Sequence, residues 1–178
     1  MNKESEGRGE DLIRNLKRYL PLRRRLATAR YCNHRLKSFP IYNGMTISLD
    51  DDLERVVLYE AMIISYISCF SSNKSSNVVL NHKKIFSGHP ELRKFHEQIE
   101  IARNKIIAHN DNRFDEVVLQ DKGAEISVSV QAELPFLGKV GLDDFNILLN
   151  KVNEFINVKI INISKDLEKA KGVSINIY

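Results

Sequence analysis

Three polar side chains within a short stretch could together handle a phosphate ester: Arg103, Asn104 and His109. An arginine guanidinium stays charged at cellular pH and can hold two phosphoryl oxygens at once. A histidine, with an unperturbed pKa of about 6.5, can give or take a proton near neutral pH. An arginine followed closely by a histidine often occurs by chance, so the surrounding sequence must decide whether the pattern is a site.

The surrounding sequence predicts a helix over Glu91–Asp111, entered at Pro90 and ended by polar residues at 110–112. Its apolar residues recur at alternating spacings of three and four, which places them on one stripe of the helix. These residues are Leu92, Phe95, Ile99, Ala102 and Ile106. At about 100° per residue, Arg103 and His109 lie roughly 120° apart around the axis and about 9 Å apart along it.

Arg103 and His109 therefore flank the apolar stripe, and we expect both to be half buried. On one straight helix they would not easily reach a single small ligand. A long arginine could wrap round, the last turn could unwind, or a second copy of the helix could complete the site. The structural alternative is that His109 is favoured by the helix dipole and that Arg103 pairs with Glu97 or Glu100.

Basic residues are concentrated at the start of the chain. Residues 1–40 hold 11 Lys and Arg against 4 Asp and Glu, a net charge of +7, whereas the remainder has a net charge of −3. This distribution suggests a polyanionic partner, and a solvated helix face would have the same composition. The residues predicted to contact such a polyanion are Arg23, Arg24, Arg25 and Lys105; the three arginines could equally bind an acidic partner.

The whole chain predicts a mainly α-helical bundle with a small inserted β-hairpin, built as one domain over residues 1–178. The predicted helices cover about 10–38, 48–70, 78–86, 91–111 and 142–171. Residues 1–9 are expected to be disordered, and Pro21 is expected to kink or break the first helix. β-Branched residues on both sides of a turn sequence predict the hairpin over 115–132.

Two of these helices carry a further expectation. The 48–70 helix starts with a capping-box spacing at Ser48. Apolar residues surround nearly its whole circumference, so it should be the most buried helix. The 142–171 helix would be about 42 Å long, which exceeds the diameter of a compact bundle. We therefore expect it to bend or to contribute to a dimer.

The two cysteines, Cys32 and Cys69, have neither metal-ligand nor disulfide-framework spacing, and Cys69 fits a small core residue. No apolar run approaches the roughly 18 residues of a membrane span. The polar start of the chain does not resemble a signal peptide. These features favour a cytoplasmic protein that does not enter a membrane.

Metal and cofactor sites are not predicted. His82, His89 and His96 are spaced by seven, but Gly88 and Pro90 interrupt the helix between them, and no carboxylate or cysteine lies at supporting ligand spacing. A glycine-rich phosphate-binding loop is also missing from the sequence.

The string ARNKIIAHND, from Ala102 to Asp111, resembles the HEPN superfamily. Members of that superfamily are helical bundles that bear an arginine, then a polar residue, then a histidine four to six residues after the arginine. Arg103, Asn104 and His109 occupy these three positions. The string is also similar to HEPN proteins of prokaryotic phage defence and toxin–antitoxin systems. The likeness covers about ten residues, and the hairpin is not part of the common HEPN core.

The resemblance implies a metal-independent endoribonuclease in which a ribose 2′-OH attacks the neighbouring phosphorus. Arg103 would stabilise the phosphate, His109 would transfer protons, and Asn104 would orient the phosphate or the imidazole. One histidine cannot easily act as base and acid together, so the resemblance implies a homodimer with a composite site at its twofold interface. An antitoxin or sensor protein is implied as a partner by analogy. The alternatives are a non-catalytic HEPN-like module that binds RNA or a protein, and a purely structural helical subunit.

Overall fold

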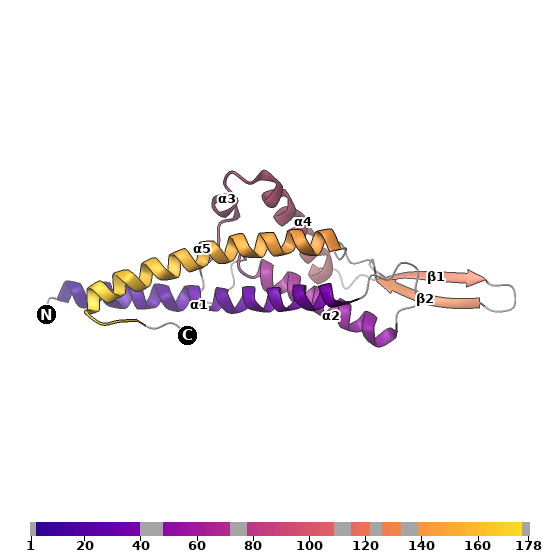
Figure 1. Ribbon diagram of the computed structural model, residues 1–178, viewed down its shortest axis with the longest axis horizontal. Helices are drawn as coiled ribbons and strands as arrows, with labels where there is room; N and C mark the ends of the chain where they lie inside the picture. The colour runs from indigo at the N-terminus through magenta and orange to yellow at the C-terminus, as the bar shows by residue number, and fades with distance from the viewer. Residues whose placement is uncertain are drawn as a thin grey trace.

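The computed structural model is mainly helical, and its described elements form a helical bundle with two paired strands at one end (Figure 1). The described residues are 3–39, 48–71, 78–108, 115–121, 126–132 and 139–175. The elements are α1 (Lys3–Ser38), α2 (Leu49–Ile67), α3 (His82–Ile85), α4 (Pro90–Ala108), β1 (Asp115–Asp121), β2 (Ile126–Ala132) and α5 (Lys139–Lys171). None of the described helices is both long enough and apolar enough to cross a bilayer.

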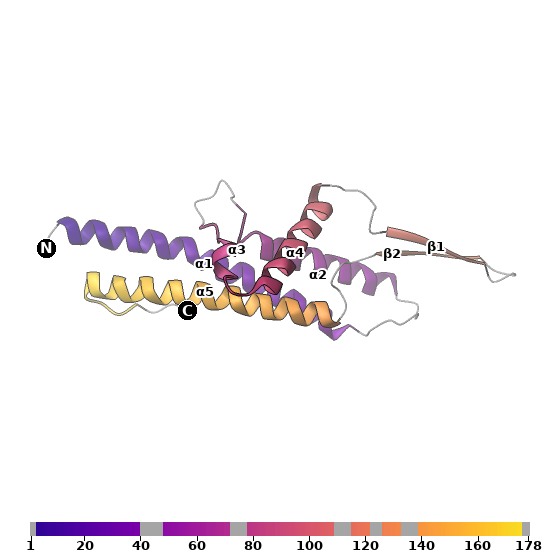
Figure 2. The same ribbon diagram turned by 90° about the horizontal axis from the view of Figure 1, so that it is seen from above.

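The two longest helices, α1 and α5, lie side by side in opposite directions (Figures 1 and 2). The buried residues of α1 and of α5 recur at three- and four-residue spacings, so each helix turns one apolar stripe towards the other. These include Leu22, Leu26 and Ala29 on α1, and Leu149, Val152 and Ile156 on α5. The great length of α5 is thus matched by an equally long partner within the same chain.

The structure of α1 differs from the sequence prediction at two places. It begins at Lys3, within the segment 1–9 that was expected to be disordered, and the break that was expected as one outcome at Pro21 does not occur. The end of α5 supports the start of α1, because Gly9 is buried against the Lys171 side chain. Pro21 removes one helical hydrogen bond, but the adjacent Leu22 is fully buried in the core, which holds the helix together there.

The start of α2 agrees with the prediction. The Ser48 Oγ accepts a hydrogen bond from the Asp51 backbone N–H at 3.1 Å, and the acidic first turn favours the positive end of the helix dipole. The helix ends at Ile67, a little before the predicted end. The expectation of burial on all sides was wrong, because Leu53, Val57 and Ile64 form an exposed apolar face.

The strands β1 and β2 lie within the interval 115–132, where the sequence analysis places a hairpin. They pair antiparallel, with Val117 opposite Val130 and Leu119 opposite Val128. Figures 1 and 2 show the pair extending beyond the helices at the end of the bundle where α5 begins.

A pair of matched leucine truncations tests where the core lies. Leu149 is fully buried between α5 and its neighbours, whereas Leu53 is 54% exposed on α2. We expect Leu149→Ala to lower the free energy of unfolding by about 2–5 kcal/mol, because it leaves a cavity. Leu53→Ala should change it by about 0.5 kcal/mol or less. Urea denaturation followed by circular dichroism measures both, and equal losses would contradict this assignment of the core.

Candidate functional site

Arg103 and Asn104 lie near the end of α4, on the part of the helix farthest from its first turn. Arg103 is half buried and Asn104 is exposed. The Arg103 Nη1 donates a hydrogen bond to the Asn104 Oδ1 at 3.1 Å. Glu97, a predicted partner of Arg103 in the structural alternative, instead forms an ion pair with Arg93 at 3.1 Å. The structure thus brings together two of the three residues of the proposed phosphate site.

The third residue, His109, lies outside the described residues, which reach Ala108 at the end of α4. Lys105 lies within α4, but its side chain is outside the described part of the chain. The distance between the Arg103 guanidinium and the His109 imidazole therefore stays a prediction of the helical spacing.

The start of α4 is held by a turn and a first hydrogen bond. Gly88 has a φ of 79°, a left-handed conformation that glycine adopts without a steric penalty. Pro90 then occupies the first helical position, as predicted, and the Arg93 N–H donates to the His89 carbonyl oxygen at 3.1 Å. The chain therefore enters α4 in a defined direction.

The predicted apolar stripe of α4 faces the interior. Ile99 and Ala102 are buried, and Leu92 and Phe95 pack partly buried against the core. The stripe lies against α2, which α4 crosses (Figure 2). Arg103 follows the buried Ala102, and its guanidinium reaches Asn104 on the exposed side of α4.

A buried histidine, which the sequence analysis set aside, lies beside the stripe. His96 is completely buried, and its Nδ1 shares a hydrogen bond of 2.8 Å with the Tyr66 hydroxyl of α2. Its ring centroid lies 4.5 Å from that of Phe70, 4.9 Å from that of His82 and 5.6 Å from that of Phe86. His82 and His96 are thus neighbours in space, although the sequence between them is interrupted.

The surroundings of His96 hold its ring neutral. The pKa of His96 is lowered to about 4, mainly by burial and also by the nearby His82, whereas Glu97 opposes the shift. Burial also raises the pKa of the Tyr66 hydroxyl, so that group stays protonated. This pair is a structural tie between α2 and α4, because neither group changes its charge near neutral pH. One signal in the sequence could have revealed it: His96 follows Phe95 and precedes Ile99 by one helical turn.

The described thiols are unsuited to nucleophilic chemistry. Cys32 and Cys69 are both buried and form no disulfide. Burial raises the pKa of the Cys69 thiol to about 12 and also raises the pKa of the Cys32 thiol. Thiolates are the reactive form of cysteine, so these two side chains serve as small core residues.

The structure separates the three predicted RNA-contacting arginines of α1. The Arg25 Nη1 donates a hydrogen bond of 2.6 Å to the Ser68 carbonyl oxygen at the end of α2. Arg23 and Arg24 are exposed. Arg25 therefore satisfies a carbonyl at a helix end and ties α1 to α2, while its two neighbours remain accessible to a partner.

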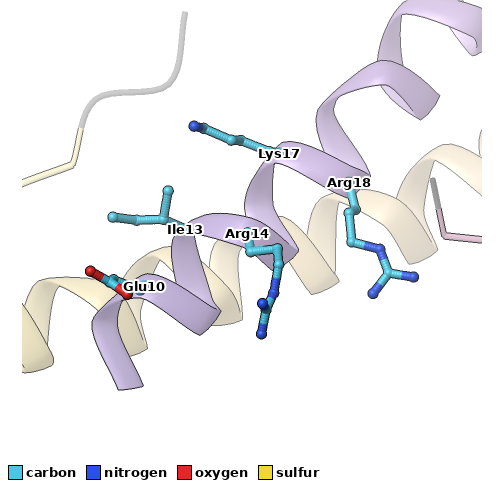
Figure 3. A pocket seen from close by; sticks show the side chains of 5 residues that line it. All are labelled: Glu10, Ile13, Arg14, Lys17 and Arg18. Atoms are coloured by element: carbon cyan, nitrogen blue, oxygen red, sulfur yellow. The ribbon is translucent and has the colours of Figure 1, made fainter. Parts of the chain in front are cut away.

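An open hollow of about 570 Å³ lies along the first half of α1 (Figure 3). Its lining consists of four charged side chains and one isoleucine: Glu10, Ile13, Arg14, Lys17 and Arg18. Arg14 also forms an ion pair with Asp11. The three cations outnumber Glu10 and Asp11 by one charge, so this face of α1 has a small net positive charge.

Among the described residues, no group of three His, Cys, Asp or Glu side chains is placed to hold a metal ion. No family model, curated protein or solved structure matches this chain.

The pH dependence of stability tests the burial of His96. Its pKa is lower in the folded protein than in the unfolded chain, so the unfolded state binds a proton first as the pH falls. Stability is therefore fully present above pH 6.5 and declines as the pH approaches 4. We expect His96→Phe to flatten the change in melting temperature between pH 7.5 and 4.5.

The matched control for this experiment is His34→Phe, which removes an exposed histidine from α1. That variant should keep the pH dependence of the wild-type protein. Equal pH profiles for the wild type and His96→Phe would show that His96 is not buried in its neutral form.

Proposed function

We propose that this chain is a metal-independent endoribonuclease of the HEPN type, with its site at the end of α4. The observation that carries the proposal is the contact between the half-buried Arg103 and Asn104. These two residues occupy two of the three positions in the HEPN resemblance, and His109 occupies the third. The packing of α4 on α2 supports it further, because a rigid helix holds the guanidinium at a defined position.

The proposed reaction needs two proton transfers. The ribose 2′-oxygen loses its proton to a base and bonds to the adjacent phosphorus, and the bond from phosphorus to the 5′-oxygen breaks. The leaving 5′-oxygen takes a proton from an acid, which yields a 2′,3′-cyclic phosphate and a free 5′-hydroxyl. In the proposal, His109 transfers these protons and Arg103 holds the phosphoryl oxygens as negative charge builds up.

A second copy of the chain would supply the second imidazole. One histidine would act as base and the other as acid, with both Arg103 side chains around one phosphodiester. Such an activity would harm its host if unrestrained, so we include an antitoxin or sensor protein as a partner in the proposal. A cytoplasmic location and the absence of any cofactor are parts of the same proposal.

The basic face of α1 would bind the RNA backbone. Arg14, Lys17, Arg18 and Arg24 fall within about 120° around the helix axis, over about 15 Å of its length. Lys17 and Arg24 are exposed. This face also favours the second candidate function, a non-catalytic helical module that binds RNA, because it requires nothing from α4.

Cleavage of a single-stranded RNA by three variants tests the nuclease. We expect His109→Ala to lose activity by about 10²–10⁴-fold, the usual contribution of a proton-transferring group. Arg103→Ala should lose about 10²–10³-fold, the usual contribution of a group that stabilises negative charge in the transition state. Arg103→Lys should remain impaired, since an ammonium group cannot hold two oxygens in the same fork. The wild type should cleave equally well with and without EDTA.

The exposed His34 gives the matched control, and His34→Ala should cleave at the wild-type rate. RNA retention by the wild type without cleavage would support the binding module. Neither cleavage nor retention, together with a lower melting temperature for His109→Ala, would support a purely structural role.

A charge reversal on α1 tests the RNA-binding face. We expect Lys17→Glu combined with Arg24→Glu to weaken RNA binding and to reduce the salt dependence of the affinity. Each lost phosphate contact lowers the slope of log K against log salt by about 0.7 for a single strand. Lys83→Glu reverses an exposed lysine on α3 as a control. Filter binding between 50 and about 300 mM salt measures these slopes, and an unchanged slope in the double variant would exclude this face.

A further inference from the structure

An exposed strip runs along α5 on the side opposite the core. Ile147 is 53% exposed and Val158 is 51% exposed, and Lys151 and Glu154 lie between them. The successive spacings are four, three and four residues, which is the pattern of a coiled-coil seam. We name these four residues the α5 strip.

The α5 strip lies away from the contacts within the chain. The buried residues of α5, which include Leu149, Val152 and Ile156, lie on the other side of the helix. Figure 2 shows α5 along one edge of the helices, where the last turn of α1 emerges beyond it next to the first turn of α5. Two exposed aliphatic side chains at seam spacing therefore have no covering element among the described parts of the chain.

The strip is complementary to its own reversed copy, because each charge then faces the opposite charge and each aliphatic residue faces an aliphatic residue. It runs apolar, cation, anion, apolar, and it is centred between residues 152 and 153. A second α5 placed antiparallel about a twofold axis at that centre would put Ile147 opposite Val158 of the second copy. The same axis would put Lys151 opposite Glu154 of the second copy. Each of these contacts would be made twice.

We propose that the α5 strip is a docking surface for a second copy of this chain, in this antiparallel register. The charges argue for a second copy, because the strip is complementary to itself and not to a surface of one sign. They also select the register. Shifting the pair by three residues in one direction puts Glu154 against Glu154, and in the other direction Lys151 against Lys151, and such like-charge contacts disfavour both alternatives.

Within one chain, the Lys151 Nζ and the Glu154 Oε2 already form an ion pair at 3.6 Å. In the proposed pair, the two lysines and two glutamates alternate around the twofold axis and form a four-charge group. The aliphatic pairs at either end shield this group from water. Ile161, which is also exposed, extends the apolar surface by one turn beyond Val158.

This docking surface goes beyond the proposed nuclease site and does not form it. In Figure 2 the end of α4 lies at the edge of the helices opposite to α5. Pairing through α5 therefore leaves the two Arg103 side chains apart. A failure of the α5 contact and a failure of the nuclease proposal are distinguishable, because each is tested by variants that leave the other surface unchanged.

Site-specific cross-linking tests the register. The native Cys32 and Cys69 are buried, so introduced cysteines provide the accessible thiols. We expect Ile147→Cys combined with Val158→Cys to form a covalent dimer under mild oxidation, as seen on a non-reducing gel. Each single variant should remain uncrosslinked. In the proposed pair, the introduced cysteine of one chain would lie about 16 Å along the axis from the same cysteine of the second chain, which is too far for a disulfide.

Exchanging the two charges of the strip tests whether its partner is a second copy of this chain. We expect Lys151→Glu alone and Glu154→Lys alone to halve the mass of the wild-type assembly in sedimentation equilibrium, because each places like charges across the axis. The combined exchange, Lys151→Glu with Glu154→Lys, should restore the wild-type mass. Arg103→Ala should leave the α5 contact intact. A protein that combines Arg103→Ala with Ile147→Cys and Val158→Cys should therefore still cross-link.

Three results would overturn the proposal. One is a mass that does not change in the single charge variants. Another is cross-linking that is as strong in the single cysteine variants as in the double variant, which indicates random collision. The third is a wild-type protein that stays monomeric at every concentration, whether or not the strip binds a different protein.

Discussion

The buried hydrogen bond between Tyr66 and His96 is the contact on which the position of α4 depends. Both side chains are removed from water, so separating them would leave a buried polar group without a partner. Phe70, Phe86 and Phe145 surround the pair with aromatic rings that complete its apolar setting. A helix anchored in this way over its first half can present its far end, with Arg103 and Asn104, away from the core.

Burial divides the cations of this chain into two kinds. Arg25 lies partly inside the protein and donates to the Ser68 carbonyl oxygen, so its charge compensates the negative end of the α2 dipole. Arg23 and Arg24, its neighbours in sequence, project from α1. Arg25 is therefore less accessible to a phosphate than its two exposed neighbours. The exposed cations can meet a phosphate at little cost, and they therefore carry the electrostatic part of the proposed RNA contact.

Two exposed surfaces on different sides of the molecule are proposed as contacts between copies of the chain. One is the end of α4, where the proposed chemistry needs a second imidazole. The other is the α5 strip, which is complementary to itself. Each proposed contact is isologous, so a chain that used both would assemble beyond a dimer. The two surfaces belong to different helix pairs, because α4 packs against α2 whereas α5 packs against α1 (Figure 2).

The sequence by itself determined the features that depend on neighbouring residues. The apolar period predicted α4 and α5, the Ser48 cap located the start of α2, and Pro90 located the start of α4, because capping and periodicity act within one or two turns. It also singled out Arg103, Asn104 and His109 as a candidate site, which stays a prediction from the sequence. Tertiary structure alone decided three other matters: that His96 is buried beside Tyr66, that Arg25 bonds to Ser68, and that one apolar face of α2 is exposed. Each depends on which element lies opposite a given helix face, and residues far apart in the sequence supply that element.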